Sequence, residues 1–251
     1  MIKALGVIPA RYASTRYPGK PLIEIAGKSM IQRVYMQACK SALAKVIVAT
    51  DDLRIYNHVK NFGGEAIMTS VSHQSGTDRC AEVLEKMNEE YDVVVNIQGD
   101  EPFINPDDIN SAVALFNDNE TDVATLYKKI TDADDVVNPN VVKVVMATSG
   151  KALLFSRCAI PFARNISTNK AVHDGIYKRH IGFYAFRSEV LRKIALLETS
   201  ILERIESLEQ LRWLENGYAI YAVEIFSDSY AIDTADDKEK IELLIKEGKI
   251  V

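Results

Sequence analysis

Three cations stand close together near the N-terminus. Arg11, Arg16 and Lys20 lie within IPARYASTRYPGKP (residues 8–21), directly after an apolar run. Guanidinium groups bind phosphate oxygens in pairs and a lysine adds a mobile point charge, so this set suits a nucleoside triphosphate. The next residue, Pro21, offers neither a backbone N–H nor a hydroxyl, which excludes a P-loop of the Walker type. A solvated basic turn is the alternative.

A second polar segment, HQSGTDR, occupies residues 73–79 and precedes a helical pattern. Gly76 would let the backbone approach a ligand closely, and Asp78 could accept hydrogen bonds from ribose hydroxyls. Ser75 or Thr77 could equally be an ordinary helix N-cap. The residues alone leave both interpretations open.

Two aspartates are candidate metal ligands. Asp100, in NIQGDEP (96–102), follows a β-branched run, and a carboxylate at the end of a parallel strand can hold Mg²⁺. Asp233, in YAIDT (230–234), is its proposed partner and is expected after a short strand and before a helix starting near Ala235. The alternative for Asp233 is a helix N-cap.

The second half of the chain holds a different set of polar residues. Arg157 lies in FSRCAIPFAR, His180 and Tyr184 lie in RHIGFY, and Glu209 and Gln210 lie on the helical pattern ESLEQLRWL. Arginine, histidine, carboxylate and amide together suit a small, hydroxyl-rich acid. For His180, a hydrogen-bonded histidine within a strand is the competing interpretation.

Strand and helix patterns alternate along the chain, which predicts βαβ units and a mostly parallel sheet whose ligands bind at the carboxyl ends of the strands. We expect helices over 29–40 and 80–88 and a mobile loop over 165–177. The expected strands are 4–9, 46–50, 65–68, 93–97, 121–127 and 178–186, with a hairpin of 141–147 and 152–156 around Ser149-Gly150.

Composition narrows the class of protein. The 251 residues suit one α/β domain, 1–251, with a mainly nucleotide-binding half (1–130) and a mainly substrate-binding half (131–251). The net charge of −5 argues against a nucleic-acid partner, and no apolar run approaches the roughly 20 residues of a membrane span, so we expect a cytoplasmic protein. The dispersed Cys39, Cys80 and Cys158 favour buried small residues over disulfides or a zinc site.

The segments IPARYASTRYPGKPL, HQSGTDR, NIQGDEP, NPNVVKVV, FSRCAIPF, RHIGFY and LEQLR, in this order across nearly the whole chain, closely resemble the 3-deoxy-manno-octulosonate cytidylyltransferase family. The resemblance implies a three-layer sugar-nucleotide-transferase α/β fold with a mostly parallel central sheet and a small β-rich region for substrate binding or dimerisation. It also implies a homodimer that requires Mg²⁺, couples CTP to the acid sugar Kdo and releases pyrophosphate, for lipopolysaccharide biosynthesis.

The resemblance also implies roles for single residues. For CTP it implies Arg11, Ser14, Arg16 and Lys20 at the triphosphate and Gln74, Ser75, Gly76, Asp78 and Arg79 around the cytidine; for magnesium, Asp100 and Asp233; for the sugar acid, Gln98, Arg157, His180, Tyr184, Glu209 and Gln210. Arg11, Arg16, Lys20 and Asp100 would be the catalytic groups. The chain departs from the commoner forms of the family at 165–177, at Tyr17, where leucine is frequent, and in the final helices.

Other functions remain open at this stage. A cytidylyltransferase for 8-amino-Kdo or sialic acid would use the same cations. A glycosyltransferase would want Asp-x-Asp where this chain has Gly-Asp-Glu-Pro. A non-catalytic nucleotide-binding regulator is disfavoured because both carboxylates and all three cations are present.

Overall fold

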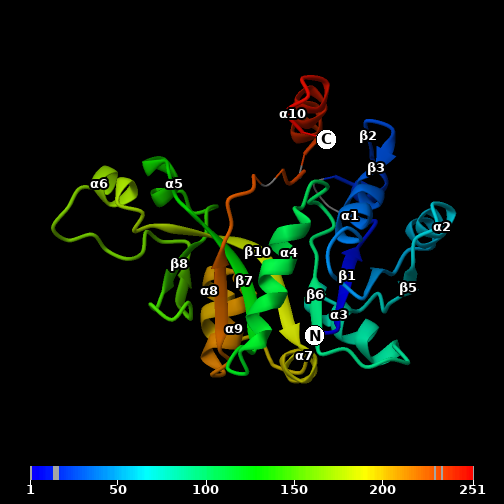
Figure 1. Cartoon of the computed structure of the whole chain (residues 1–251), viewed down its shortest axis with the longest axis horizontal. Helices are drawn as coiled ribbons and strands as arrows, with labels where there is room; N and C mark the ends of the chain where they lie inside the picture. Colours follow the sequence, from blue (N-terminus) through cyan, green and yellow to red (C-terminus); the bar gives the residue numbers. More distant parts are fainter. Residues whose placement is uncertain (1, 14–16, 229, 233, 251) are drawn as a thin grey trace. The chain divides into compact units, whose positions relative to one another are not determined.

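The computed structural model describes residues 2–13, 17–228, 230–232 and 234–250. The chain divides into two compact units. Figure 1 labels most of the helices and strands of both units. Unit 1 comprises residues 1–110 and 227–251, and unit 2 comprises residues 111–226. The candidate nucleotide and metal residues belong to unit 1, and all the candidate sugar residues except Gln98 belong to unit 2.

Unit 1 contains a parallel sheet in the order β6-β1-β4-β5. The central strand β1 is apolar throughout, and Leu5, Val7 and Ile8 are fully buried, as expected of a parallel strand that is covered on both faces. The strands are β1 (Ala4–Ala10), β4 (Lys45–Thr50), β5 (Ala66–Met68) and β6 (Val93–Asn96), and a small hairpin is formed by β2 (Glu24–Ile25) and β3 (Lys28–Ser29).

Short capped helices connect the strands of unit 1. In α1, the Ser29 side chain accepts a hydrogen bond from the Gln32 amide, and one face of the helix buries Met30, Ile31 and Val34. The helices are η1 (Lys20–Leu22), α1 (Met30–Ala38), α2 (Leu53–Asn61), α3 (Gly76–Lys86) and α10 (Ala235–Lys246), and α4 (Pro106–Ala114) runs across the division between the units.

Unit 2 has a mixed sheet. Strand β11 (Ile220–Glu224) runs parallel to β7 (Val123–Lys129), while β10 (Lys178–Arg187) pairs antiparallel with β7 and β8 (Lys143–Met146), and β8 with β9 (Ala152–Ser156). Its helices are η2 (Leu115–Asn117), α5 (Ala133–Val137), α6 (Thr168–His173), α7 (Ser188–Ile194), α8 (Ile201–Glu206) and α9 (Glu209–Glu215).

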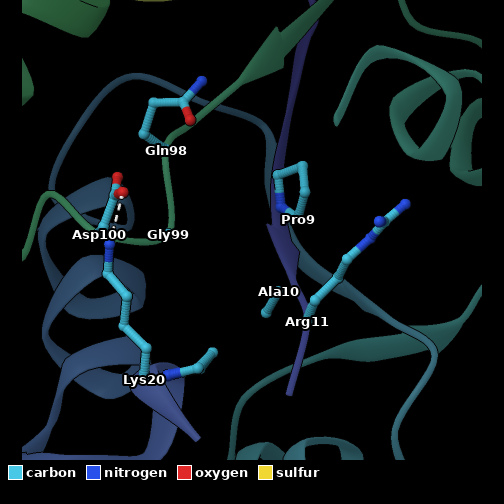
Figure 2. Close-up of a pocket in the computed structure, with 8 residues that line it drawn as sticks. Pro9, Ala10, Arg11, Lys20, Gln98, Gly99 and Asp100 are labelled. Carbon is cyan, nitrogen blue, oxygen red and sulfur yellow. Dashed lines mark hydrogen bonds and ion pairs between the residues drawn. The ribbon is translucent and has the colours of Figure 1, made fainter. Parts of the chain in front are cut away.

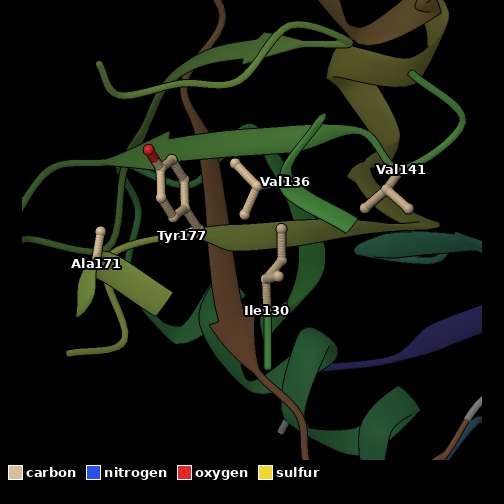
Figure 3. Packing of buried hydrophobic residues seen from close by; sticks show 5 residues of the cluster. All are labelled: Ile130, Val136, Val141, Ala171 and Tyr177. Atoms are coloured by element: carbon tan, nitrogen blue, oxygen red, sulfur yellow. The ribbon is translucent and has the colours of Figure 1, made fainter. Parts of the chain in front are cut away.

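Unit 2 contains a small cluster of buried apolar residues (Figure 3). It joins Ile130, Val136, Val141, Ala171 and Tyr177, all of them buried. The loop prediction for residues 165–177 is wrong over part of that range, because residues 168–173 form helix α6, whose Ala171 belongs to this cluster. Helix α6 is capped there by Ser167 and buries one residue, Ala171, which is too little to give a visible periodicity.

Most of the other fold predictions are confirmed. The α/β class is confirmed, the predicted strands are found with small shifts in their ends, and the hairpin turns through Gly150 at a φ of 87°. The short strand expected before residue 233 is β11, which ends at Glu224, and the helix expected near Ala235 is α10. The expected burial holds for Cys80 only, since the other two cysteines are exposed.

Within the described residues, none of the helices has the length and apolarity that crossing a bilayer requires.

Candidate functional site

A cavity of about 150 Å³ opens in unit 1 where β1 and β6 end (Figure 2). It combines two cations and one carboxylate with small and cyclic residues that leave space for a ligand. The lining residues are Pro9, Ala10, Arg11, Lys20, Pro21, Gln98, Gly99 and Asp100. The carboxyl ends of adjacent parallel strands are the usual place for ligands in α/β proteins.

Lys20 and Asp100 form an ion pair in this cavity. The Nζ–Oδ2 distance is 2.8 Å, and the side chains are 13% and 34% exposed, respectively. Lys20 starts the 3-10 turn η1 after Gly19, whose φ of 72° places it in the left-handed region that favours glycine. The Gly19 amide donates to the Tyr12 carbonyl at 3.0 Å and so closes the loop that carries Lys20. Two predicted catalytic side chains, 80 residues apart, therefore meet.

Arg11 follows the last residue of β1, and its guanidinium points away from the Lys20–Asp100 pair (Figure 2). Among the described residues, Nη2 of Arg11 is buried and has no hydrogen-bond partner. A buried donor without an acceptor costs about 1–3 kcal/mol, and more when it is charged. An anionic ligand would supply the missing acceptor.

Gly99 sits where β6 passes into the loop that carries Asp100. A Cβ at this position would lie 2.8 Å from the carbonyl oxygen of Pro9, which is rigid backbone. The absence of a side chain therefore allows the ends of β1 and β6 to approach each other.

We expect Gly99→Ala to lower the free energy of unfolding by about 1–3 kcal/mol, because the backbone must shift to admit the methyl group. The matched control is Gly182→Ala in β10, where a Cβ meets no atom within 4 Å and the change should stay within about 0.5 kcal/mol. Urea unfolding of both variants measures the difference. Equal stability of the two variants would contradict the close approach.

The HQSGTDR segment forms the start of α3. Ser75 is the N-cap, and it exchanges hydrogen bonds with Asp78 in a capping box, so the N-cap interpretation is confirmed. Oδ2 of Asp78 also accepts from the Gln74 amide at 3.2 Å. At Gly76, a Cβ would lie 3.0 Å from Nδ2 of Asn96, so this glycine permits close packing of α3 on β6. Contact of these residues with cytidine stays a prediction.

Arg79 lies in the interior. Its side chain is 1% exposed, and its guanidinium donates to Asp51 and to the Thr69 hydroxyl, each at 2.6 Å. This pair fixes α3 to the ends of β4 and β5. The sequence prediction missed Asp51, although a carboxylate directly after a buried strand was the signal that identified Asp100.

The second metal candidate cannot be placed, because Asp233, like Ser14 and Arg16, lies outside the described residues. Its neighbours are informative. The Ile232 amide donates to the Asp100 carbonyl at 3.0 Å, so Ile232 lies beside Asp100. Helix α10 has Thr234 as its N-cap, in a capping box with Asp237.

In unit 2, His180 is buried in β10. Nε2 lies 2.9 Å from the Thr125 hydroxyl, and the ring packs against Phe155 and Tyr184. Burial lowers the pKa of His180 to about 3. His180 is therefore neutral in the folded protein and makes the hydrogen bond expected of a strand histidine.

This burial predicts a pH dependence of stability. Because the folded pKa of about 3 lies below the ordinary value of 6.5, protons bind preferentially to the unfolded chain between these two values. The contribution of His180 to stability is complete above pH 6.5 and falls by about 2 kcal/mol by pH 5, at about 1.4 kcal/mol per unit. NMR of the ring should show no titration between pH 8 and 5. A transition near pH 6.5 would contradict the prediction.

Tyr184, Glu209 and Gln210 lie in the same unit as His180. Burial, and secondarily the charge of Glu209, raises the pKa of the Tyr184 hydroxyl. Gln210 is 3% exposed, and within the described part of the chain its Nε2 has no hydrogen-bond partner. Glu209 accepts from Nη2 of Arg212 at 2.8 Å. The unpaired amide of Gln210 is the feature here that calls for a polar ligand.

The fold and the cavity define a class of protein, namely an α/β protein with a cavity lined by cations at the carboxyl ends of its parallel strands. A family model described as Cytidylyltransferase matches residues 5–241. The chain belongs to the 3-deoxy-manno-octulosonate cytidylyltransferase family.

Curated relatives with that name are similar over nearly the full length. The protein from Parabacteroides distasonis is 51% identical over 96% of this chain and 97% of its own. The Bacteroides thetaiotaomicron protein is 50% identical over 98% and 99%. A solved structure of CMP:2-keto-3-deoxy-manno-octonic acid synthetase complexed with CTP superposes with a TM-score of 0.90 at 44% identity, covering 98% of this chain and 99% of that one.

Proposed function

We propose that this chain transfers CMP from CTP to 3-deoxy-manno-octulosonate (Kdo), giving CMP-Kdo and pyrophosphate for lipopolysaccharide biosynthesis. The observation that carries the proposal is the ion pair of Lys20 and Asp100 in the cavity at the ends of β1 and β6. It brings together two of the predicted catalytic groups in a chain about half identical to enzymes of that name.

The proposed chemistry is electrostatic. The anomeric hydroxyl of Kdo attacks the α-phosphorus of CTP in line, and pyrophosphate leaves. Lys20 and Arg11 bind phosphate oxygens and neutralise the charge that develops on the leaving group. The buried, unpaired Nη2 of Arg11 supports this role, because a phosphate oxygen would satisfy it.

We propose Mg²⁺ as the cofactor, with Asp100 as one ligand and Asp233 as its predicted partner. Carboxylate oxygen suits Mg²⁺, which takes one or two carboxylates together with substrate phosphates. Bound Mg²⁺ would polarise the phosphates and ease deprotonation of the sugar hydroxyl.

The residues proposed to bind the acid sugar are Gln98, Arg157, His180, Tyr184, Glu209 and Gln210. A neutral His180 and the unpaired amide of Gln210 suit sugar hydroxyls. An arginine would pair with the sugar carboxylate through two parallel hydrogen bonds.

We further propose a cytoplasmic homodimer. Helix α8 supports the dimer, because it buries none of its own residues and exposes Ile201, Leu202 and Ile205. A second copy would cover this apolar surface. Sedimentation of the wild type and of an Ile205→Glu variant tests this proposal, and a monomeric wild type would contradict it.

Pyrophosphate release tests the proposed function. CTP, Mg²⁺ and Kdo should give turnover, and ATP, GTP or UTP in place of CTP should give little. Release with 8-amino-Kdo or sialic acid alone would keep the chemistry and change the sugar. CTP binding without release from any of these sugars would favour a regulator.

A further inference from the structure

One network of polar side chains in unit 2 joins three separate elements, β8, β9 and α8. It centres on Arg157, the residue directly after β9. Both main-chain groups of Arg157 are held by charged side chains: its amide donates to Oε2 of Glu206 at 2.9 Å, and its carbonyl accepts from Nζ of Lys143 at 2.6 Å. Charge-assisted hydrogen bonds of this kind are roughly twice as strong as neutral ones.

The guanidinium of Arg157 is held as well. Nε donates to the Glu206 carbonyl at 2.6 Å, Nη1 to the Pro139 carbonyl at 2.9 Å and Nη2 to the Ser207 carbonyl at 3.3 Å. These contacts orient the guanidinium plane and occupy one N–H on each nitrogen, so each Nη keeps a second N–H. Arg157 is thus fixed in place yet still able to donate to a carboxylate.

Lys143 supports the network from within the sheet. It is fully buried, and Nζ also donates to the carbonyls of Asn138 at 3.0 Å and Val141 at 2.6 Å. Burial lowers the pKa of Lys143. The three acceptors tie the turn before β8 to the residue after β9.

Glu206 connects this network to the start of α9. Besides the Arg157 amide, its carboxylate accepts from the Ser156 hydroxyl at 2.6 Å. Glu206 ends α8, and the next residue, Ser207, has a φ of 51°, in the left-handed region. Helix α9 begins two residues later at Glu209. The position of Glu206 therefore determines where the turn between α8 and α9 lies.

We propose that Glu206 is a positioning residue for the acid-sugar site. It fixes the turn that leads into Glu209 and Gln210 relative to Arg157, so that these side chains are held ready for the sugar. This inference rests on the proposed function, which supplies the sugar. Glu206 acts through these residues and does not itself contact the sugar.

The test compares Glu206→Ala with Glu206→Gln. Alanine removes the two carboxylate oxygens that accept from the Ser156 hydroxyl and the Arg157 amide. The KM for Kdo should therefore rise about tenfold or more, while the KM for CTP stays within about twofold. Glutamine can still accept from the Arg157 amide and donate to the Ser156 hydroxyl, so it should restore most of the sugar affinity. The matched control is Glu215→Ala, an exposed glutamate at the end of α9, which should leave both constants unchanged.

A readout without substrate separates this inference from the proposed function. In Glu206→Ala, the amides of Arg157 and Cys158 should exchange hydrogen at least about tenfold faster, because they depend on Glu206 and on the Ser156 hydroxyl that Glu206 holds. If the alanine variant does not fold, Glu206→Asp, shorter by one methylene, should show the same pattern at about threefold. Wild-type turnover with unchanged sugar KM in the variants, equal rises in both KM values, or unchanged exchange would overturn the proposal. If the wild type shows no turnover but Glu206→Ala still exchanges these amides faster than the wild type, only the proposed function is refuted.

Discussion

Asp100→Ala should reduce turnover at least about 1,000-fold while leaving the fold intact. The substitution removes the carboxylate at the end of β6, the predicted Mg²⁺ ligand, and leaves Lys20 without the oxygen that lies 2.8 Å from Nζ. Loss of one charge-stabilising group in a transferase typically costs several kcal/mol of transition-state stabilisation, and each 1.4 kcal/mol is a factor of ten. Initial rates of pyrophosphate release and a thermal unfolding curve measure both parts of the prediction.

Asp107→Ala is the matched control for Asp100→Ala. Asp107 is an exposed aspartate in the first turn of α4 and lies in the same unit, so its replacement should change the rate by less than about twofold. Asp100→Asn keeps the shape and removes the charge, and it should lose nearly as much activity as alanine. A folded Asp100→Ala protein with a tenth or more of wild-type activity would refute the metal assignment.

Lys20→Ala should lower kcat about 100-fold to 1,000-fold and change the KM for the sugar little. Its Nζ points into the cavity at Asp100, where it would neutralise charge on the phosphates as the α-phosphorus is attacked. An interaction made mainly in the transition state lowers kcat rather than raising KM. Steady-state kinetics at saturating CTP measure the effect.

Lys28→Ala provides the comparison for Lys20→Ala. Lys28 is an exposed lysine on β3 in the same unit, and its loss removes the same charge outside the cavity. It should leave kcat within about twofold of the wild type. If Lys20→Ala kept wild-type kcat at saturating CTP, its role at the phosphates would be wrong.

The parts of the fold that the sequence predicts best are those in which local pattern and burial agree. Strand β1 is one case: a run of apolar residues buried on both faces has few alternatives to a central parallel strand. Helix α6 is the opposite case, because a six-residue helix with one buried alanine has no periodicity to detect.

The candidate site shows the same limit. Lys20 and Asp100 are recognisable from residue type and from their place in the segments that follow β1 and β6, and the structure brings them together. Asp51 follows a buried strand as Asp100 does, but its pairing with Arg79, 28 residues away, depends on tertiary packing and not on a local pattern. The network around Arg157 is likewise a product of tertiary packing, since Glu206 is 49 residues away.

Phosphorus NMR of the protein mixed with CTP, Mg²⁺ and Kdo shows directly which phosphorus atom is attacked. We expect CTP to disappear while one equivalent of a CMP diester and one of pyrophosphate appear, and neither product to form without Kdo. Unchanged CTP, or its conversion to CDP and inorganic phosphate, would contradict transfer at the α-phosphorus and with it the proposed function.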